Sequence, residues 1–241
     1  MRRRWPAFLA GVTAAVLAGC QNQAASDEAF GRRVRAYLLS HPEILQETAK
    51  RLEVKQEDDE AAVERLGRAR LPGLRTAVER DSADFVANPG GRVTVTEFYD
   101  YRCPHCINAA PRVLALIHEH PEVRFVFKEM PIFGPVSEHA ARAALAVKAV
   151  NGDYLGVYGA FMATHGLDDE AIDALAHQKG AISVPEQNRH LAANAALFQQ
   201  LGLGGTPAFI VGDQFIYGED MDALDTAIAR VKAGGTGLLA P

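Results

Sequence analysis

The sequence predicts an α/β fold that is interrupted by an inserted block of helices and preceded by a separate helical segment. A β-prone run at residues 93–99 leads directly into a C-x-x-C motif at the start of a helical pattern, residues 107–120. A second strand pattern follows this helix and gives a strand–helix–strand unit. A hairpin pattern and a closing helix, at residues 208–232, come only after several more helical patterns. We therefore expect the two halves of one α/β domain on either side of the inserted helices.

The composition is that of an ordinary globular protein. Of the 241 residues, 48% are hydrophobic and 23% are charged. The formal net charge of −5 argues against nucleic acid as a partner. Two of the three cysteines form the C-x-x-C motif, and the third, Cys20, lies near the N-terminus. Because there is no second pair, we expect no structural disulfide framework.

The N-terminus has the features of an export signal. Three arginines precede an apolar run, Pro6 to Leu17, that is too short to span a membrane comfortably. The run ends in L-A-G-C at residues 17–20, which resembles a bacterial lipobox, whose cysteine is lipidated and becomes the new N-terminus. We expect a lipoprotein signal peptide at residues 1–19 and lipidation of Cys20. The alternative is an ordinary cleaved signal followed by an incidental cysteine.

The same segment predicts where the protein works. Gln21 stands where lipoproteins retained in the inner membrane carry an aspartate, by resemblance to sorted lipoproteins. We therefore expect a periplasmic protein that is held by a lipid anchor at the outer membrane. Disulfides persist in that compartment, which agrees with a redox motif.

A helical segment at residues 29–83 follows a short tether, residues 20–28. Apolar residues follow helical spacing from Phe30 on, and S-H-P-E at residues 40–43 fits a capping box that opens a second helix. The apolar stripe is thin and charges are many, so the segment cannot bury much core alone. Either it packs on the α/β domain or its stripe meets the same stripe of another chain. We favour the second alternative, a homo-oligomer.

The α/β domain should consist of a first part at 84–136, a helical insertion at 137–203 and a second part at 204–233, before a tail at 234–241. In the first part we expect strands at residues 85–86, 93–99 and 123–128, with a helix from the motif to about residue 120. The insertion should hold helices at 137–150, 154–163, 168–178 and 185–201, the last opened by a capping box of Ser183 and Glu186. The second part should hold strands at 208–211 and 214–217 and a helix at 221–232.

The C-x-x-C motif carries the expected chemistry. Two thiols at this spacing on a first helical turn can close a small disulfide while the first thiol still faces a substrate. The helix N-terminus stabilises a thiolate there, and His105 can add a donor or a positive charge. Cys103 is the expected nucleophile and Cys106 the resolving thiol. A zinc site would lack ligands, since two cysteines and one poorly placed histidine do not supply four, and a purely structural bridge is the other alternative.

The residues around the motif resemble those of the DsbA family of thiol–disulfide oxidoreductases. They are E-F-Y-D-Y at 97–101 before C-P-H-C at 103–106, K-E-M-P-I at 128–132 and G-T-P-A-F at 205–209. The resemblance implies a thioredoxin-like fold with an inserted helical domain and no cofactor or metal. It also implies that the redox-active Cys103–Cys106 disulfide is oxidising, with Pro104 and His105 as part of the catalytic motif. The N-terminal helical segment is similar to that of the Com1-like and suppressor-of-copper-sensitivity C branch, some of whose members oligomerise through it.

Thr206 and Pro207 are expected to form a cis-proline loop that faces Cys103. Loops of this kind hold an extended peptide in thioredoxin folds, so both residues are candidates for substrate binding. The alternative is a simple trans turn after the preceding pair of glycines.

Glu97 is a candidate proton shuttle. It lies in a strand that we expect to be buried on both faces, where an acid needs a partner or has a raised pKa. Near the second thiol, such an acid could exchange a proton with it. Lys128, on the neighbouring strand, is the candidate counter-charge, and a purely structural ion pair is the alternative.

We therefore expect a protein thiol–disulfide oxidoreductase that forms or isomerises disulfides in exported proteins through a mixed disulfide at Cys103. Its membrane redox partner would be DsbB-like for an oxidase and DsbD-like for an isomerase. The alternative from another class is a non-enzymatic envelope lipoprotein, a chaperone or a copper-binding module on a redox fold, since copper(I) favours thiolates. His139, His165 and His190 receive no role.

Overall fold

The structure is a computed structural model that describes residues 28–186 and 188–235. The expected signal peptide, the lipidation site Cys20, residues 21–27 of the tether and most of the tail lie outside these ranges. The chain divides into two compact units, Met1–Glu60 and Ala61–Pro241.

The described part of the first unit is helical except at one break. Residues 28–40 form a helix, and α2 (Glu43–Glu79) begins after the break at His41 and Pro42. This confirms the predicted second helix. Large apolar side chains are exposed along this unit: Phe30, Val34, Tyr37, Leu39, Leu45, Leu52 and Val54. Among the described residues, no helix combines the length and the apolar character that crossing a membrane requires.

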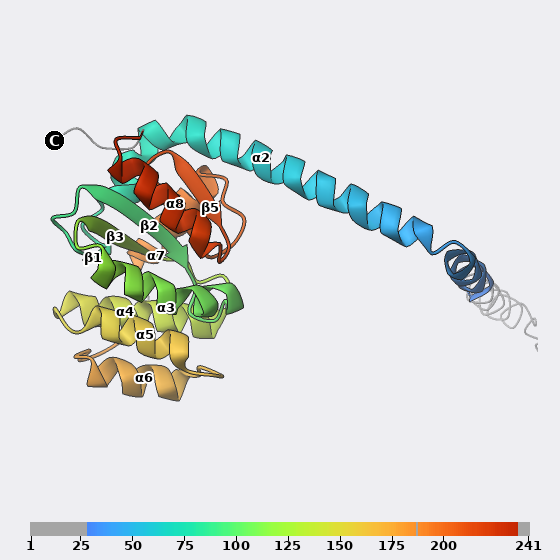
Figure 1. The fold of residues 1–241 in the computed structure, drawn as a ribbon. Coiled ribbons are helices and arrows are strands. Elements are labelled where there is room, and N and C mark those ends of the chain that lie inside the picture. Colours follow the sequence, from blue (N-terminus) through green and yellow to red (C-terminus); the bar gives the residue numbers. More distant parts are fainter. Residues whose placement is uncertain (1–27, 187, 236–241) are drawn as a thin grey trace, which may run out of the picture. The chain divides into compact units, whose positions relative to one another are not determined.

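The second unit contains a five-stranded mixed sheet in the order β1-β3-β2-β4-β5 (Figure 1). The central strands, β2 (Val93–Tyr99) and β3 (Val123–Glu129), are parallel, and all of their residues are buried. The strand β1 (Phe85–Ala87) pairs antiparallel with β3, and β4 (Ala208–Val211) pairs antiparallel with β2. The strand β5 (Gln214–Tyr217) completes the predicted hairpin with β4.

Helices cover both faces of this sheet. On one face, Tyr99 and Phe127 share a core with α3 (Pro104–Glu119), α5 (Tyr154–Ala163) and α8 (Met221–Lys232). The helices α4 (Pro135–Ala149) and α6 (Asp169–Gln178) pack with α5 on the same side (Figure 1). On the other face, Phe98 and Ile210 pack with α7 (Arg189–Gln200) and with Leu71 of α2. The predicted α/β fold with inserted helices is therefore confirmed.

The start of α7 differs from the prediction. The helix was expected from residue 185, opened by Ser183 and Glu186, but it begins at Arg189. Asn188 is the residue that caps it, because its side-chain oxygen accepts a hydrogen bond of 2.9 Å from the backbone N–H of His190. Two capping signals lie close together in this stretch, and the later one is used.

The end of α2 is fixed by side chains from the two central strands. Lys128 Nζ donates to the carbonyl of Ala77 at 2.6 Å, and Thr96 Oγ1 donates to the carbonyl of Val78 at 3.2 Å. Arg124 donates to the next carbonyl, that of Glu79. A helix leaves its last carbonyls without internal partners and carries partial negative charge there, so two cations at this end stabilise it.

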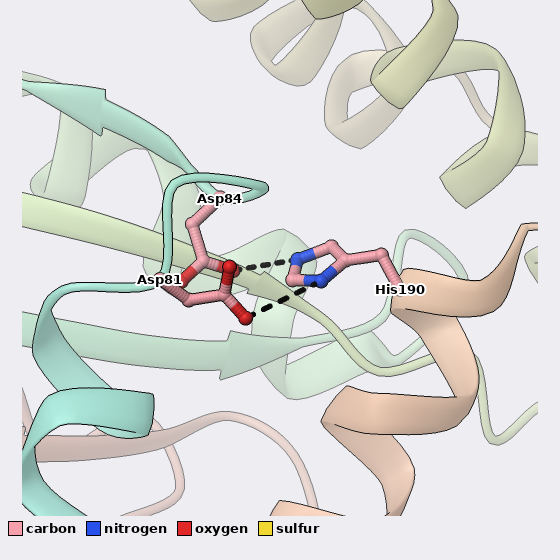
Figure 2. A group of neighbouring side chains, drawn as sticks. All are labelled: Asp81, Asp84 and His190. Carbon is pink, nitrogen blue, oxygen red and sulfur yellow. Dashed lines mark hydrogen bonds and ion pairs between the residues drawn. The ribbon is translucent and has the colours of Figure 1, made fainter.

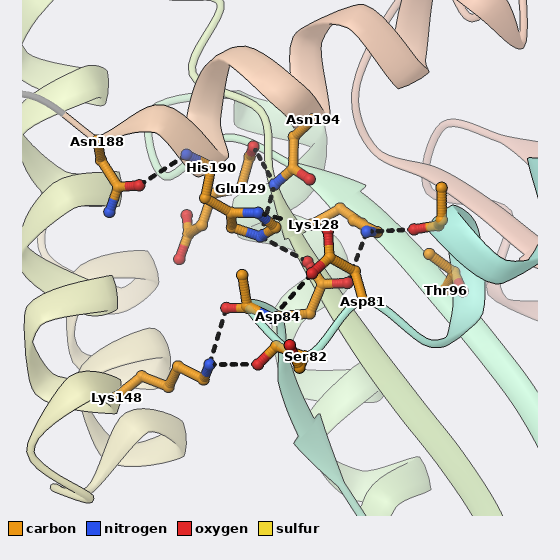
Figure 3. A network of polar contacts seen from close by, with 12 residues as sticks. Asp81, Ser82, Asp84, Thr96, Lys128, Glu129, Lys148, Asn188, His190 and Asn194 are labelled. Atoms are coloured by element: carbon orange, nitrogen blue, oxygen red, sulfur yellow. Dashed lines mark hydrogen bonds and ion pairs between the residues drawn. The ribbon is translucent and has the colours of Figure 1, made fainter.

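The turn between α2 and β1 belongs to a partly buried network of ion pairs and hydrogen bonds (Figures 2 and 3). Lys128 Nζ lies 2.5 Å from Asp84 Oδ2, and His190 Nε2 lies 2.7 Å from Asp84 Oδ1. His190 Nδ1 faces Asp81 at 3.7 Å, and Lys148 Nζ donates to the carbonyls of Ser82 and Ala83 at 2.8 and 2.9 Å. Asp81, Asp84 and His190 lie close enough together to hold a metal ion. However, the ammonium of Lys128 already neutralises Asp84, and both ring nitrogens of His190 face carboxylates, so the arrangement fits an ion-pair network.

Candidate functional site

The C-x-x-C motif lies where β2 ends and α3 begins. Cys103 is the N-cap residue of α3 in extended backbone geometry, and Pro104 occupies the first turn, where its missing N–H costs nothing. Both cysteines are buried, at 2% and 0% exposure, and both are free thiols. The Thr206–Pro207 peptide bond is cis, and Cys103 Sγ donates to the carbonyl of Thr206 at 3.0 Å. The structure therefore brings together two segments that are about a hundred residues apart in sequence.

The two thiols have opposite acidities. The pKa of Cys103 is lowered to about 5, first because the Cys106 thiol donates to its thiolate. Burial opposes this effect, whereas the side chain of Thr206 and the backbone N–H groups of Cys106 and His105 lower the pKa further. Burial strongly raises the pKa of Cys106, and the neighbouring Cys103 raises it further. At neutral pH Cys103 is therefore a thiolate ready to attack a disulfide, while Cys106 keeps its proton.

His105 lies at the surface beside these thiols. Its Nδ1 atom is 3.4 Å from Glu219 Oε1, and the His105 side chain is 63% exposed. Glu219 directly precedes Asp220, the N-cap residue of α8, and sequence reasoning gave it no role. It places a carboxylate within reach of the histidine between the two cysteines.

Glu97 is buried, as predicted, but Lys128 is not its counter-charge. Neighbouring residues of a strand point to opposite faces of the sheet. Lys128 is the register partner of Phe98, so its side chain points to the face opposite that of Glu97, where it reaches Asp84. Glu97 instead accepts weak hydrogen bonds from Tyr158 Oη at 3.3 and 3.4 Å. Burial raises the pKa of Glu97 to about 8. Its charge is among the causes that raise the pKa of Cys106, so it lies close enough to act on the resolving thiol.

Asp100 is a residue of the site that sequence reasoning missed. One of its carboxylate oxygens accepts from the backbone N–H of Arg102 at 2.7 Å and from Ser137 Oγ at 2.8 Å. The other accepts from the backbone N–H groups of Ile132 and Phe133 at 2.6 and 2.9 Å. One buried carboxylate thus joins the turn that carries Cys103 to the loop between β3 and α4. The only signal in the sequence was an acid placed directly after a buried strand.

Glu129 was missed as well. It is buried at the end of β3, and Oε1 accepts from Tyr101 Oη at 3.1 Å and from Tyr154 Oη at 2.6 Å. Burial raises its pKa to about 8, and hydrogen bonds from the tyrosines lower it in part. Together with Glu97 and Asp100, Glu129 gives the site three buried acids, whereas the sequence indicated one.

Two family models match the chain. A model described as "Thioredoxin" matches residues 83–230, and one described as "Copper resistance protein ScsC N-terminal domain" matches residues 28–58. The ScsC N-terminal match ends within α2, and the thioredoxin match begins after the end of that helix.

Several solved structures are similar to the chain. A thioredoxin-like oxidoreductase from Silicibacter pomeroyi is 36% identical, with a TM-score of 0.61, and the match covers 66% of this chain and 98% of that one. A linker-deletion variant of ScsC from Proteus mirabilis is 25% identical, with a TM-score of 0.67, and covers 88% of this chain and 97% of its own. A periplasmic thioredoxin-like protein from Salmonella enterica serovar Typhimurium is 26% identical over 66% of this chain and 96% of its own, with a TM-score of 0.62.

The chain is also similar to part of two much longer curated proteins. These are Na(+)/H(+) antiporters of the NhaA type from Salinispora arenicola and Salinispora tropica, both 28% identical. The match covers 59% and 58% of this chain but only 24% and 23% of the relatives, so the chain spans about a quarter of their length.

Proposed function

The chain belongs to the thioredoxin family, among the DsbA-like and ScsC-like thiol–disulfide oxidoreductases, and from this premise we propose that it exchanges disulfides with exported proteins in the periplasm. One observation carries the proposal: a Cys103 thiolate with a pKa of about 5 lies beside a protonated, buried Cys106. A nucleophile and a resolving thiol of this kind are the two components that thiol–disulfide exchange requires.

The exchange begins at Cys103. Its thiolate attacks one sulfur of a client disulfide, so a Cys103–client bond forms and the other client sulfur leaves as a thiolate. Cys106 then loses its proton and attacks Cys103 Sγ, which releases the second client thiolate and closes the Cys103–Cys106 disulfide. Two electrons pass from the protein to the client. The same steps in reverse oxidise a client dithiol.

The acidity of Cys103 bears on the direction of exchange. A stabilised thiolate favours the reduced protein, so its disulfide is readily given up to a client dithiol. This supports oxidation as the intrinsic tendency of the site. A DsbB-like membrane partner would keep the cysteines oxidised for that task, whereas a DsbD-like partner would keep them reduced for isomerisation.

The decisive test compares three forms of the protein in the refolding of a scrambled disulfide protein. We expect Cys103→Ser to abolish catalysis, because no nucleophile remains. Cys106→Ser should instead accumulate a mixed disulfide between Cys103 and the client, visible as a band that reducing agent removes. If Cys103→Ser catalyses refolding as well as the wild-type protein does, the enzymatic function is refuted, and the non-enzymatic chaperone or copper-binding module replaces it.

The location follows the same proposal. The similar protein from Salmonella enterica is described as periplasmic, and L-A-G-C at residues 17–20 provides a lipidation site at Cys20. We expect the wild-type protein in the outer-membrane fraction and the Cys20→Ala variant in the soluble periplasmic fraction. Equal membrane association of both would contradict the lipid anchor.

A further inference from the structure

Two buried carboxyl groups lie on neighbouring strands beneath the motif. Glu129 of β3 is the register partner of Tyr99, so Glu97 lies two residues away from that position on the same face of the sheet. Strand spacing and rise per residue place the two Cα atoms about 8 Å apart. Both residues are almost fully buried, at 2% and 1% exposure. Two acids this close in a dry environment influence each other's ionisation.

Each acid has its own hydrogen-bond donors. Glu129 Oε1 accepts from Tyr101 and Tyr154, and Tyr99 Oη links these two hydroxyls at 3.0 and 2.7 Å. This closed set of three hydroxyls serves Glu129. Glu97 accepts from a separate hydroxyl, that of Tyr158. The two carboxyls can therefore be changed independently by single hydroxyl deletions.

The groups that act on the two acids come from several elements. They are Tyr154 and Tyr158 of α5, Cys106 of α3, Tyr99 of β2, and Asp100 and Tyr101 in the turn that follows β2. Each of them is neutral or acidic, so no positive charge among these groups offsets the repulsion between the two carboxylates. Ionisation of one carboxyl group therefore opposes ionisation of the other. Burial raises the pKa of both acids to about 8, and the charge of Glu129 contributes to the rise at Glu97.

We propose that Glu129, held by Tyr101 and Tyr154, is a positioning residue that acts through Glu97 and thereby controls proton transfer at Cys106. The inference rests on the proposed function, because it concerns the step in which Cys106 resolves the mixed disulfide. In that step the Cys106 proton passes to the Glu97 carboxylate as Cys106 Sγ bonds to Cys103 Sγ and the bond to the client breaks. In the reverse step the Glu97 carboxylic acid returns the proton to Cys106. A charged Glu129 disfavours a charged Glu97 and so sets the pH at which Glu97 can accept the proton.

The resolving step can be followed in isolation with the reduced full chain. An aromatic disulfide whose released thiolate absorbs visible light reacts first at Cys103 and forms a mixed disulfide. Cys106 then displaces the second aromatic thiolate in a separate, concentration-independent phase. The pH at which this second phase reaches half of its maximal rate reports the ionisation that the proposal concerns.

Three variants test the proposal through this midpoint: two should lower it and one should raise it. Glu129→Gln removes a neighbouring negative charge and should lower the midpoint by about one pH unit. Tyr154→Phe removes a donor from Glu129, so that acid is less charged and the midpoint should fall by a smaller amount. Tyr158→Phe removes the donor of Glu97 itself and should raise the midpoint. If Glu129 had only a structural role, the variants would slow the second phase, but the two tyrosine variants would not shift its pH midpoint in opposite directions.

An unchanged midpoint in Glu129→Gln, or shifts of the same sign in both tyrosine variants, would overturn the inference. If Glu129→Gln does not fold, as judged by its thermal transition, the tyrosine pair decides. The proposed function is tested separately by the first phase at Cys103 and by exchange with a client protein. A wild-type protein without catalysed client exchange would refute the function, while the second phase would still test the role of Glu129.

Discussion

At the sulfur of Cys103, the Cys106 thiol is the largest single cause of the lowered pKa. Replacing Cys106 by alanine removes this donor, whereas serine keeps one at the same place. We expect Cys106→Ala to raise the pKa of Cys103 by about one to two units, the equivalent of one hydrogen bond to a charged group. Cys106→Ser should stay close to the wild-type value.

The measurement is the ultraviolet absorbance of the thiolate as a function of pH. Each variant contains one motif cysteine, so in a chain of residues 21–241, which lacks Cys20, the thiolate signal belongs to Cys103 alone. Equal pKa values in Cys106→Ala and Cys106→Ser would show that backbone donors and Thr206 are sufficient.

The buried acids predict how stability depends on pH. Glu97 and Glu129 have folded-state pKa values raised to about 8, above those of an unfolded chain. Such groups stabilise the fold fully below their unfolded pKa, and this contribution is lost as pH rises towards 8. For the oxidised protein, in which the cysteines do not titrate, Glu129→Gln should flatten the decline between pH 5 and 8 by up to about 1.4 kcal/mol per pH unit. Urea unfolding at several pH values gives the free energy of unfolding of both proteins. Identical slopes of this free energy against pH in Glu129→Gln and the wild-type protein would contradict the prediction.

The residues of the motif could be predicted from sequence, whereas their buried partners could not. The spacing of the cysteines indicates a helix start after a strand, and that is where Cys103 lies. The burial of Glu97 followed from its place in a central strand. Its partner did not, because the face on which Lys128 lies depends on the register of two strands that are joined by a helix.

At the scale of elements, Asp100 joins the turn that carries Cys103 to the loop between β3 and α4. Asp100→Asn replaces an acceptor oxygen by an N–H₂ group, which would face the N–H groups of Ile132 and Phe133 or those that Arg102 and Ser137 donate. We expect a loss of about 2–3 kcal/mol in the free energy of unfolding, since buried donors are left without an acceptor. Ser137→Ala removes only one donor to the same carboxylate and should cost about 1 kcal/mol.

Chemical denaturation of the oxidised variants measures this difference. Equal stability of Asp100→Asn and the wild-type protein would mean that the loop finds other acceptors. The comparison with Ser137→Ala separates the loss of the charged acceptor from the loss of a single contact.

Most elements could be predicted because their patterns are local. The strands at 208–211 and 214–217 and the helices at 154–163 and 221–232 have the predicted bounds, since turns and caps mark each end. The predicted start of α7 was wrong because two capping signals, at Ser183 and Asn188, lie within six residues of each other. Only tertiary contacts decide between them. His190, at that start, is held by Asp84 from a turn about a hundred residues earlier, and no local pattern reports such a partner.

At the scale of the whole molecule, the α2 helix crosses the boundary between the two units. Its part from residue 61 on belongs to the second unit, where Leu71 and Val78 are buried in the core. The predicted N-terminal segment, residues 29–83, therefore has two physical characters. Residues 61–83 are structural support for the sheet, and the part before them keeps large apolar side chains exposed.

This division sharpens the test of self-association. A chain of residues 21–241, without the lipidation site, retains the exposed stripe, whereas residues 61–241 lack it but keep the compact second unit. We expect the longer chain to form a homo-oligomer and the shorter one to be a monomer, because exposed apolar side chains at helical spacing are buried when copies associate. Truncation at residue 80 would be uninformative, since it also removes Leu71 and Val78 from the core.

Light scattering of both chains gives their masses, and substitution of Phe30 and Tyr37 by serine in the longer chain is the matched control. The substituted chain should dissociate while its rate of reaction at Cys103 stays unchanged, because both substitutions lie in the first unit. If association brings several Cys103 sites together, isomerisation should fall with dissociation while oxidation of a simple dithiol client persists. A monomeric longer chain would instead assign the direction of exchange to the membrane redox partner alone.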